Sequence, residues 1–222
     1  MLINKNTKIL SENVILVPYR KEHVKKYHEW MQSEELQYLT ASEPLTLEEE
    51  YQMQISWMTD DNKCTFIILD RNVFDKTQNE VDAMIGDTNL FFSDCENKMV
   101  AEAEIMIAMK DARGSHKGWK AMLLMLLYGI HELNVHQYTV KIIADNNISI
   151  NMFEKMGFVI TNHNNVFNEV ILNKVVDDSW ISWLKMSVGQ FQIINENDNY
   201  FFYNLLKYFF RTNLNFINLI LT

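Results

Sequence analysis

The sequence predicts an α+β protein, in which strands and helices follow one another along the chain. Short segments in which apolar residues alternate with polar ones, or which are rich in β-branched residues, recur along the chain and predict strands. Between them lie segments whose apolar residues recur at helical spacing. The composition is globular, with 48% hydrophobic residues, 6 Gly and 2 Pro among 222 residues. This length suits a domain with a full core plus an appendage. We place the domain at residues 1–180 and a C-terminal helical extension at 181–222.

Charge and cysteine content exclude several classes of protein. The formal net charge is −9 and Lys and Arg form no basic run, so the electrostatic footprint of a nucleic-acid-binding protein is missing. A basic peptide suits this acidic surface better as a partner. The two cysteines, Cys64 and Cys95, lack the spacing of metal ligands, and we expect neither a metal centre nor a disulfide framework.

The N-terminus lacks the uninterrupted apolar segment of a signal peptide. No apolar stretch of about 18 residues occurs anywhere, which argues against a membrane-spanning helix. We therefore expect an intracellular, cytoplasmic protein.

The first part of the chain predicts a strand and two helices. Residues 14–18 form an apolar run that ends in proline, and a helix is expected from about Lys21. Residues 42–44 then break the chain. Thr46 and Glu49 have the spacing of a capping box, so a second helix begins there.

Two further strands are predicted at residues 64–70 and 85–92. The segment between them, residues 71–82, is polar and without a period. It predicts an exposed hairpin loop.

The central feature is a strand that runs through a turn into a helix. Residues 101–108 alternate, with Ala103, Ile105 and Ile107 on one face and Glu102, Glu104 and Met106 on the other. After the turn at residues 113–118, apolar residues recur at helical spacing, so a helix of about four turns begins near Gly118. The first N–H groups of such a helix are unpaired and point, together with its dipole, at one place. That place attracts phosphate, although an ordinary strand-to-helix turn has the same pattern.

The remaining domain predicts a strand, a short helix and a hairpin. Residues 137–144 alternate and are rich in β-branched residues. Residues 145–156 begin with asparagines that suit a helix cap, and Gly157 suits the left-handed residue that ends a helix. Strands at 158–160 and 167–172 would close the sheet.

The turn resembles the acetyl-CoA pyrophosphate loop of the GNAT superfamily of N-acetyltransferases. Arg113 and Gly118 match the two ends of the family pattern Arg-x-x-Gly-x-Gly/Ala, and His116 stands where the first glycine is usual. The resemblance implies the GNAT acyl-CoA N-acyltransferase fold, with a mixed, mostly antiparallel sheet, and acetyl-CoA as co-substrate without a metal. It also implies that the following loop residues contact the cofactor: Arg113, Gly114, Ser115, His116, Lys117, Gly118 and Trp119.

A second segment, residues 145–158, resembles the family pattern of Asn, then Ser, then an aromatic residue before Glu-Lys-x-Gly-Phe. In the family this helix packs beside the pantetheine arm, which implies cofactor-binding roles for Asn146, Ser149 and Phe153. The aromatic position is often a tyrosine that protonates the leaving thiolate. Phe153 lacks this hydroxyl.

A third segment, residues 30–46, is similar to the matching region of the N-acetyltransferase 9-like proteins. In the wider family this region covers the acceptor site, which implies that Tyr38, Ser42 or Glu43 lines it. The alternative is a capped surface turn over core residues.

The resemblance also implies how the central strand acts. The backbone of Ile105, Met106 and Ile107 would meet the thioester and the pantetheine amides. A carboxylate on this strand is the expected proton acceptor, Glu104 first and Glu102 second, since both share a face. The alternative is that both are solvated strand residues. A histidine imidazole can act as a base, but we expect His116 at the phosphates.

We therefore expect an acetyl-CoA-dependent N-acetyltransferase that acts on a protein or peptide amine. The alternative is a catalytically weakened GNAT-fold interaction module, for example with cytoskeletal partners. His116, Phe153 and Lys120, which stands where related loops often carry an acid, favour this alternative. From Tyr200 on, the sequence predicts an amphipathic helix that packs on the domain, on another chain or on a membrane surface.

Overall fold

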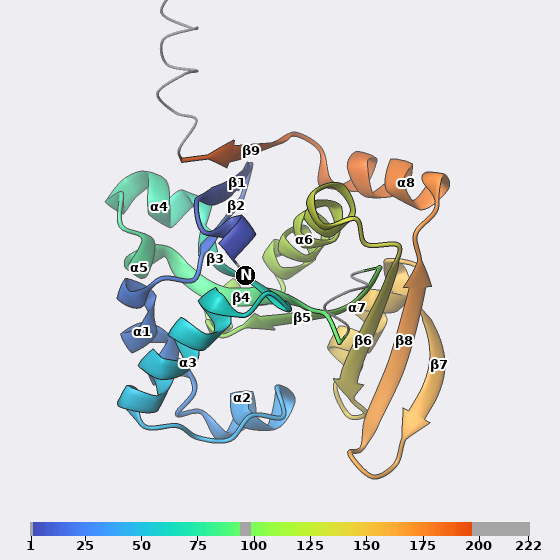
Figure 1. Ribbon diagram of the computed structural model, residues 1–222, viewed down its shortest axis with the longest axis horizontal. Coiled ribbons are helices and arrows are strands. Elements are labelled where there is room, and N and C mark those ends of the chain that lie inside the picture. The colour runs from blue at the N-terminus through green and yellow to red at the C-terminus, as the bar shows by residue number, and fades with distance from the viewer. Residues whose placement is uncertain (1, 94–98, 197–222) are drawn as a thin grey trace, which may run out of the picture.

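The structure is a computed structural model, and it describes residues 2–93 and 99–196 (Figure 1). Within these residues, nine strands form one sheet in the order β7-β8-β6-β5-β4-β3-β2-β1-β9. The strands are β1 (Thr7–Ser11), β2 (Val14–Pro18), β3 (Lys63–Asp70), β4 (Met84–Phe91), β5 (Val100–Ile107), β6 (Gln137–Ile143), β7 (Val159–Asn164), β8 (Glu169–Val175) and β9 (Phe191–Asn195). The described neighbours pair antiparallel except β5 and β6, which pair parallel.

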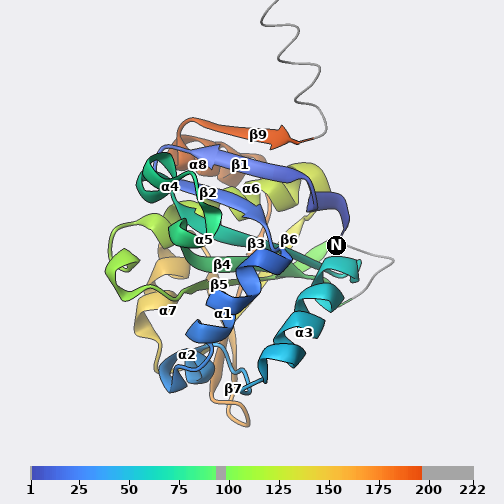
Figure 2. The ribbon, with the colours of Figure 1, turned by 90° about the vertical axis from the view of Figure 1, so that its left-hand side faces the viewer.

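Helices cover both faces of the sheet (Figures 1 and 2). The α-helices are α1 (Val24–Trp30), α2 (Glu34–Leu39), α3 (Leu47–Thr59), α4 (Arg71–Thr77), α5 (Glu80–Ala83), α6 (Lys117–Leu133), α7 (Asn147–Lys155) and α8 (Asp178–Val188). Short 3-10 turns are η1 (Leu2–Asn4), η2 (Lys21–His23) and η3 (Lys110–Ala112). One core packs α6, α7 and α8 against the sheet, and a second core packs α1 and α2 against the other face.

The central strand β5 contributes side chains to both cores, as its alternation predicts. Ala101 and Ala103 are buried in the core under α6, and Ile105 and Ile107 pack against that core. Met106 points the other way and is buried in the second core. Side chains on the Glu102 and Glu104 face of β5 therefore lie toward α1 and α3.

Local capping predictions are confirmed at two helices. The Thr46 hydroxyl accepts from the Glu49 N–H and the Glu49 carboxylate accepts from the Thr46 N–H, which forms the expected capping box at α3. The Asn146 side chain accepts from the Ser149 N–H at the start of α7. Gly157, after α7, has a positive φ of 90°.

The prediction of an exposed hairpin loop at residues 71–82 is wrong, because two short helices, α4 and α5, form in this segment. Asx caps explain the difference. The Asp70 side chain accepts from the N–H groups of Asn72 and Val73, and the Asn79 side chain accepts from those of Val81 and Asp82. These caps provide hydrogen-bond acceptors for the first N–H groups of α4 and α5, two helices whose sequences show no amphipathic period.

Two strands at one end of the sheet, β1 and the edge strand β9, were not expected from the sequence. β1 pairs with β2, and β9 pairs antiparallel with β1, from Thr7 opposite Asn195 to Ser11 opposite Phe191. The range predicted as a helical extension, 181–222, thus contains the end of α8 and a sheet strand in its described part. The division at residue 180 stays a prediction, and the amphipathic helix from Tyr200 lies outside the described residues.

Candidate active site

The sheet opens where its parallel pair separates. β5 and β6 pair only from Val100 opposite Gln137 to Glu102 opposite Thr139. Beyond this point β5 stays paired with β4 as far as Ile107, and β6 stays paired with β8 as far as Ile143. The backbone of β5 from residue 103 to 107 is therefore left without a strand partner on its β6 side. We call this opening the β5–β6 gap.

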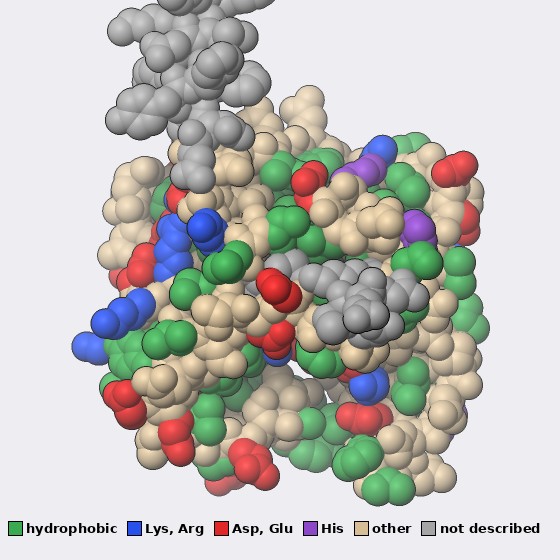
Figure 3. Space-filling model, in the orientation of Figure 1, with side chains coloured by type: hydrophobic (Ala, Val, Ile, Leu, Met, Phe, Trp, Pro, Cys, Tyr) green, Lys and Arg blue, Asp and Glu red, His purple; other side chains and the backbone are tan. Residues whose placement is uncertain are grey.

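The surface is hollowed between the side that carries α2 and α3 and the side that carries β6 to β8 (Figure 3). Polar backbone groups next to an opening need a partner, because an unpaired buried N–H or C=O costs free energy. An extended ligand with amide groups satisfies this need in the way that a neighbouring strand does.

The loop before α6 presents backbone N–H groups to one place. The first intrahelical bond runs from the Lys120 N–H to the His116 C=O, so the N–H groups of Lys117, Gly118 and Trp119 precede the helical ladder. Gly114 and His116 both have positive φ, 72° and 59°. A loop with this shape at the N-terminus of a 17-residue helix fits an anion such as a phosphate.

Close packing places this helix end beside the gap. A Cβ added to Gly118 would lie 3.1 Å from Cγ1 of Ile107, near the end of β5. The loop and the unpaired backbone of β5 are therefore parts of one site.

Several side chains of the loop already form hydrogen bonds or ion pairs with other residues of the chain. Lys117 pairs with Asp70 at 2.7 Å, and the Ser115 hydroxyl donates to the Ala112 carbonyl. Arg113 donates through Nε to the Ile107 carbonyl at 2.8 Å and through Nη1 to Glu35. The guanidinium is thus fixed at the end of β5, where it adds a positive charge to the N–H groups of the loop.

Helix α2 lies across the site and contacts both of its sides. At its first turn, Glu35 pairs with Arg113 at 2.5 Å and with Lys110 at 3.1 Å, and these hydrogen bonds lower the pKa of Glu35. At its last turn, the Tyr38 hydroxyl donates to Asp145, between β6 and α7, at 3.0 Å. The helix joins the two sides of the gap.

The two candidate bases on β5 differ in how strongly they are paired. Glu102 forms an ion pair with Lys141 of β6 at 2.6 Å, whereas the Glu104 carboxylate lies 3.8 Å from Lys63. The Glu104 side chain is 46% exposed, yet surrounding protein atoms desolvate it and raise its pKa, with Lys63 acting in the opposite direction. A carboxylate with a raised pKa and access to solvent is suited to accept a proton, so the geometry favours Glu104 over Glu102.

The residues expected along the pantetheine arm have different surroundings. Asn146 is partly exposed but uses its side-chain oxygen to cap α7, and Ser149 is partly buried. The Phe153 ring is 2% exposed and packs edge-on against Phe158 at 5.2 Å, inside the core. Trp119 packs edge-on against Trp183 of α8. Roles for these residues in cofactor binding stay predictions.

Two residues near the site, Glu35 and Asp87, were not singled out from the sequence, and Tyr38 was expected at the acceptor site but without its contact to Asp145. Glu35 and Tyr38 contact residues 78 and 107 positions away, which no local pattern reports. Asp87 lies in a buried strand, β4, and is 3% exposed. An ionisable residue inside a predicted strand is the signal that would have identified Asp87.

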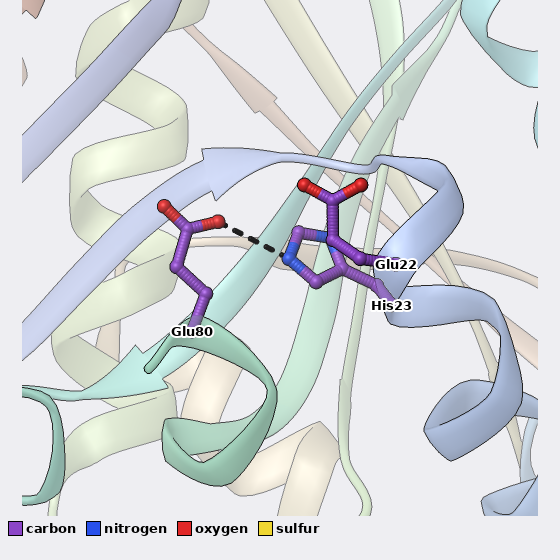
Figure 4. Close-up of side chains that lie close together, drawn as sticks. All are labelled: Glu22, His23 and Glu80. Atoms are coloured by element: carbon purple, nitrogen blue, oxygen red, sulfur yellow. Dashed lines mark hydrogen bonds and ion pairs between the residues drawn. The ribbon is translucent and has the colours of Figure 1, made fainter. Parts of the chain in front are cut away.

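A group of possible metal ligands lies away from the gap. In the described residues, ligand atoms of Glu22, His23 and Glu80 lie within 4.8 Å of one another (Figure 4). Glu80, however, already pairs with Lys8 at 2.8 Å and with His23 at 3.2 Å. The other ring nitrogen of His23 accepts from the Arg20 N–H. We therefore read the cluster as an ion-pair network that holds elements together.

Comparison with known proteins gives a consistent result. The family model for the acetyltransferase (GNAT) domain matches residues 13–159. The alpha/beta-tubulin-N-acetyltransferase 9 of Drosophila melanogaster is 49% identical over 192 residues, which cover 85% of this chain and 96% of the relative. The human protein of the same name is 48% identical over 187 residues, which cover 83% and 90%.

Solved structures show the same fold at low sequence identity. A spermidine N-acetyltransferase from Vibrio cholerae, in complex with CoA and spermine, aligns with a TM-score of 0.61 at 15% identity, covering 80% of this chain and 98% of that one. A ribosomal L7/L12 alpha-N-protein acetyltransferase, RimL, aligns with a TM-score of 0.63 at 12% identity, covering 77% and 95%. Across the residues that the structure describes, no helix has the length and apolar character needed to span a membrane.

Proposed function

The chain belongs to the GNAT acetyltransferase family and is an N-acetyltransferase, and we propose that it transfers the acetyl group of acetyl-CoA to an amine of tubulin. The main observation behind this proposal is that β5 and β6 stop pairing after Glu102 and Thr139 and leave a gap beside the loop before α6. Relatives named as alpha/beta-tubulin-N-acetyltransferases support a protein acceptor. Such an acceptor implies a cytoplasmic location.

The residues present fit acetyl-CoA. The N–H groups of residues 114–119 and the Arg113 guanidinium would hold the pyrophosphate, because a helix N-terminus and a cation both stabilise negative charge. The backbone of Ile105, Met106 and Ile107, which has no strand partner on its β6 side, would bond the amides of the pantetheine arm, with Asn146 and Ser149 on the opposite side of the gap. When bound, acetyl-CoA supplies an activated acyl group as a thioester.

Glu104 is the residue that we assign to proton transfer. An amine is protonated near neutral pH and must lose a proton before it attacks a carbonyl carbon. The Glu104 carboxylate has a raised pKa and is half exposed on the face of β5 toward α3, so it can reach solvent and an entering amine. Phe153 carries no hydroxyl, so the proton that the thiolate takes up would come from the amine itself or from water.

The acidic character of the region around α2 and α3 supports a cationic acceptor. No Lys or Arg occurs between Lys26 and Lys63, and acidic side chains lie around α2 and α3 in Figure 3. A field of one sign near a cleft raises the local concentration of the opposite charge. Tyr38, Ser42 and Glu43 lie in this region and would contact the acceptor.

Purified tubulin, acetyl-CoA and the full chain provide the test. We expect mass spectrometry to find acetylated tubulin amines with the wild type and at least a tenfold lower initial rate with Glu104→Gln. Glu132→Gln, an exposed carboxyl at the end of α6, is the matched control and should keep the wild-type rate. Acetyl-CoA binding without acetylation of tubulin would contradict the acceptor and favour the alternative of a weakened interaction module.

A further inference from the structure

A second carboxyl group lies beside Glu104 in the interior of the domain. Asp87 on β4 is opposite Met106 of β5, and Glu104 is opposite Asn89, so Asp87 and Glu104 are diagonal neighbours on adjacent strands. Residues in this relation on one face are within reach of each other's long side chains. Asp87 is 3% exposed, whereas the Glu104 side chain is 46% exposed.

Asp87 has one oxygen that the protein leaves without a partner. Its Oδ2 accepts from the Asn89 side chain at 2.8 Å, and Asn89 in turn accepts from the Thr65 hydroxyl. Its Oδ1 is buried and has no hydrogen-bond partner among the described residues. A buried carboxylate oxygen without a donor is unfavourable when charged, and it is an available position for a proton.

The electrostatic surroundings of Asp87 come from four neighbouring elements. Burial, together with the negative charge of Glu104 on β5, raises the pKa of Asp87 to about 7, whereas Lys63 on β3 and the hydrogen bond from Asn89 act in the opposite direction. Tyr27 on α1 and Tyr19 after β2 interact electrostatically with Asp87 and also with Glu50 on α3. Glu50 is itself buried, pairs with His28 at 3.5 Å, and has a pKa raised by burial.

We propose that Asp87 and Glu104 act as a carboxyl pair, in which Glu104 accepts the proton released by the acceptor ammonium and Asp87 takes it into the interior of the domain. This inference rests on the acetyltransferase function proposed above. Asp87 touches no substrate and acts through Glu104, so it is a positioning residue. A buried acid that titrates near the working pH exchanges protons in both directions without a large energy difference.

The proton balance of the reaction shows why such a pair is useful. The acceptor enters as an ammonium and loses one proton to Glu104. The nitrogen lone pair then forms the bond to the acetyl carbon, the C–S bond breaks, and the sulfur takes the second proton. The products are an amide, a thiol and one released proton. Asp87 would hold this proton, so that Glu104 is again anionic when the amine attacks, and return it through Glu104 after the products leave.

The test compares the pH dependence of tubulin acetylation from pH 6 to 8.5 in the wild type and in Asp87→Asn. We expect kcat/KM of the wild type to rise through about pH 7. In Asp87→Asn we expect kcat/KM to be about tenfold lower at pH 7 and to rise only at higher pH, because only an amine that is already neutral reacts. The affinity for acetyl-CoA should not change. A merely structural role would lower the rate equally at every pH.

Glu80→Gln is the matched control, since it makes the same change of carboxyl to amide at a side chain that is 17% exposed and lies outside the pair. It should keep the wild-type pH profile. If the wild type is active and Asp87→Asn has the same pH profile of kcat/KM, the inference is overturned while the proposed function stays intact.

Carbon-13 NMR of the Asp87 carboxyl tests the pair without catalysis. A midpoint near 7 in the wild type and a lower midpoint in Glu104→Gln are expected, because the variant removes the neighbouring negative charge. A midpoint near 4, or one that Glu104→Gln leaves unchanged, would overturn the carboxyl pair even if tubulin proves not to be the acceptor.

Discussion

His116 is a residue with a side chain in a backbone conformation that favours glycine. It stands at the position where related loops have glycine, and its backbone is left-handed, with φ 59° and ψ 6°. A left-handed conformation costs a residue with a Cβ about 1–2 kcal/mol. This strain lowers the stability of the folded state, and it accompanies the loop shape that we propose for the phosphate site.

Replacing His116 measures this cost. We expect His116→Gly to be more stable than His116→Ala by about 1 kcal/mol, because alanine keeps the left-handed strain and glycine removes it. Urea unfolding of the two variants gives the difference directly. Equal stability would mean that the His116 backbone is not left-handed in solution.

Helix α2 is the element that connects the two sides of the site. Its contacts, Glu35 with Arg113 and Tyr38 with Asp145, link the loop before α6 to the loop before α7. Because Arg113 is the side chain assigned to the pyrophosphate, Glu35 and the cofactor compete for the same guanidinium. The helix also belongs to the region assigned to the acceptor, so cofactor binding would alter the acceptor side.

Removing the charge of Glu35 should strengthen acetyl-CoA binding. The pair is partly exposed, at 32% for Arg113 and 41% for Glu35, and solvent screening keeps the contribution of such pairs small. Isothermal titration should therefore show an affinity about two- to fivefold higher for Glu35→Gln. Glu34→Gln, the exposed neighbouring residue, is the control. A weaker affinity in Glu35→Gln would mean that Glu35 orients Arg113 for binding.

The ion-pair network around Glu80 joins elements that are distant in the sequence. Glu80 on α5 pairs with Lys8 on β1 and with His23 on η2, and Lys8 also pairs with Glu196, directly after β9, at 2.9 Å. Burial alone would raise the pKa of Glu80, but the hydrogen bonds from His23 and Lys8 lower it to about 2.

The depressed pKa makes a prediction about acid stability. Stabilisation by Glu80 is complete above the unfolded pKa of about 4.3 and is lost as the pH falls toward the folded value of about 2. We expect wild type and Glu80→Gln to differ in unfolding free energy by on the order of 2–3 kcal/mol at pH 6 and by much less at pH 2.5. A difference that does not change with pH would contradict the assigned ion pairs.

At the scale of the whole molecule, local patterns predicted most elements but few of their long-range contacts. Alternation in residues 101–108 and the asparagine cap of α7 are local, so sequence reasoning found β5 and α7. Pairing of β9 with β1 joins residues 180 to 188 positions apart, from Ser11 opposite Phe191 to Thr7 opposite Asn195, and short strands there have no distinctive period. The candidate site divides in the same way: the loop and Glu104 were predicted, whereas Glu35 and Asp87 depend on packing.

The central claim is that the β5–β6 gap and the loop before α6 bind acetyl-CoA. Isothermal titration of acetyl-CoA into the wild type and Arg113→Glu tests it most directly, with Arg71→Glu, which removes an exposed ion pair to Asp75 elsewhere, as the control of equal charge change. We expect micromolar binding by the wild type and by Arg71→Glu, and at least a tenfold loss in Arg113→Glu, because a carboxylate then faces the phosphates. Equal binding by Arg113→Glu, or no binding by the folded wild type, would contradict the account.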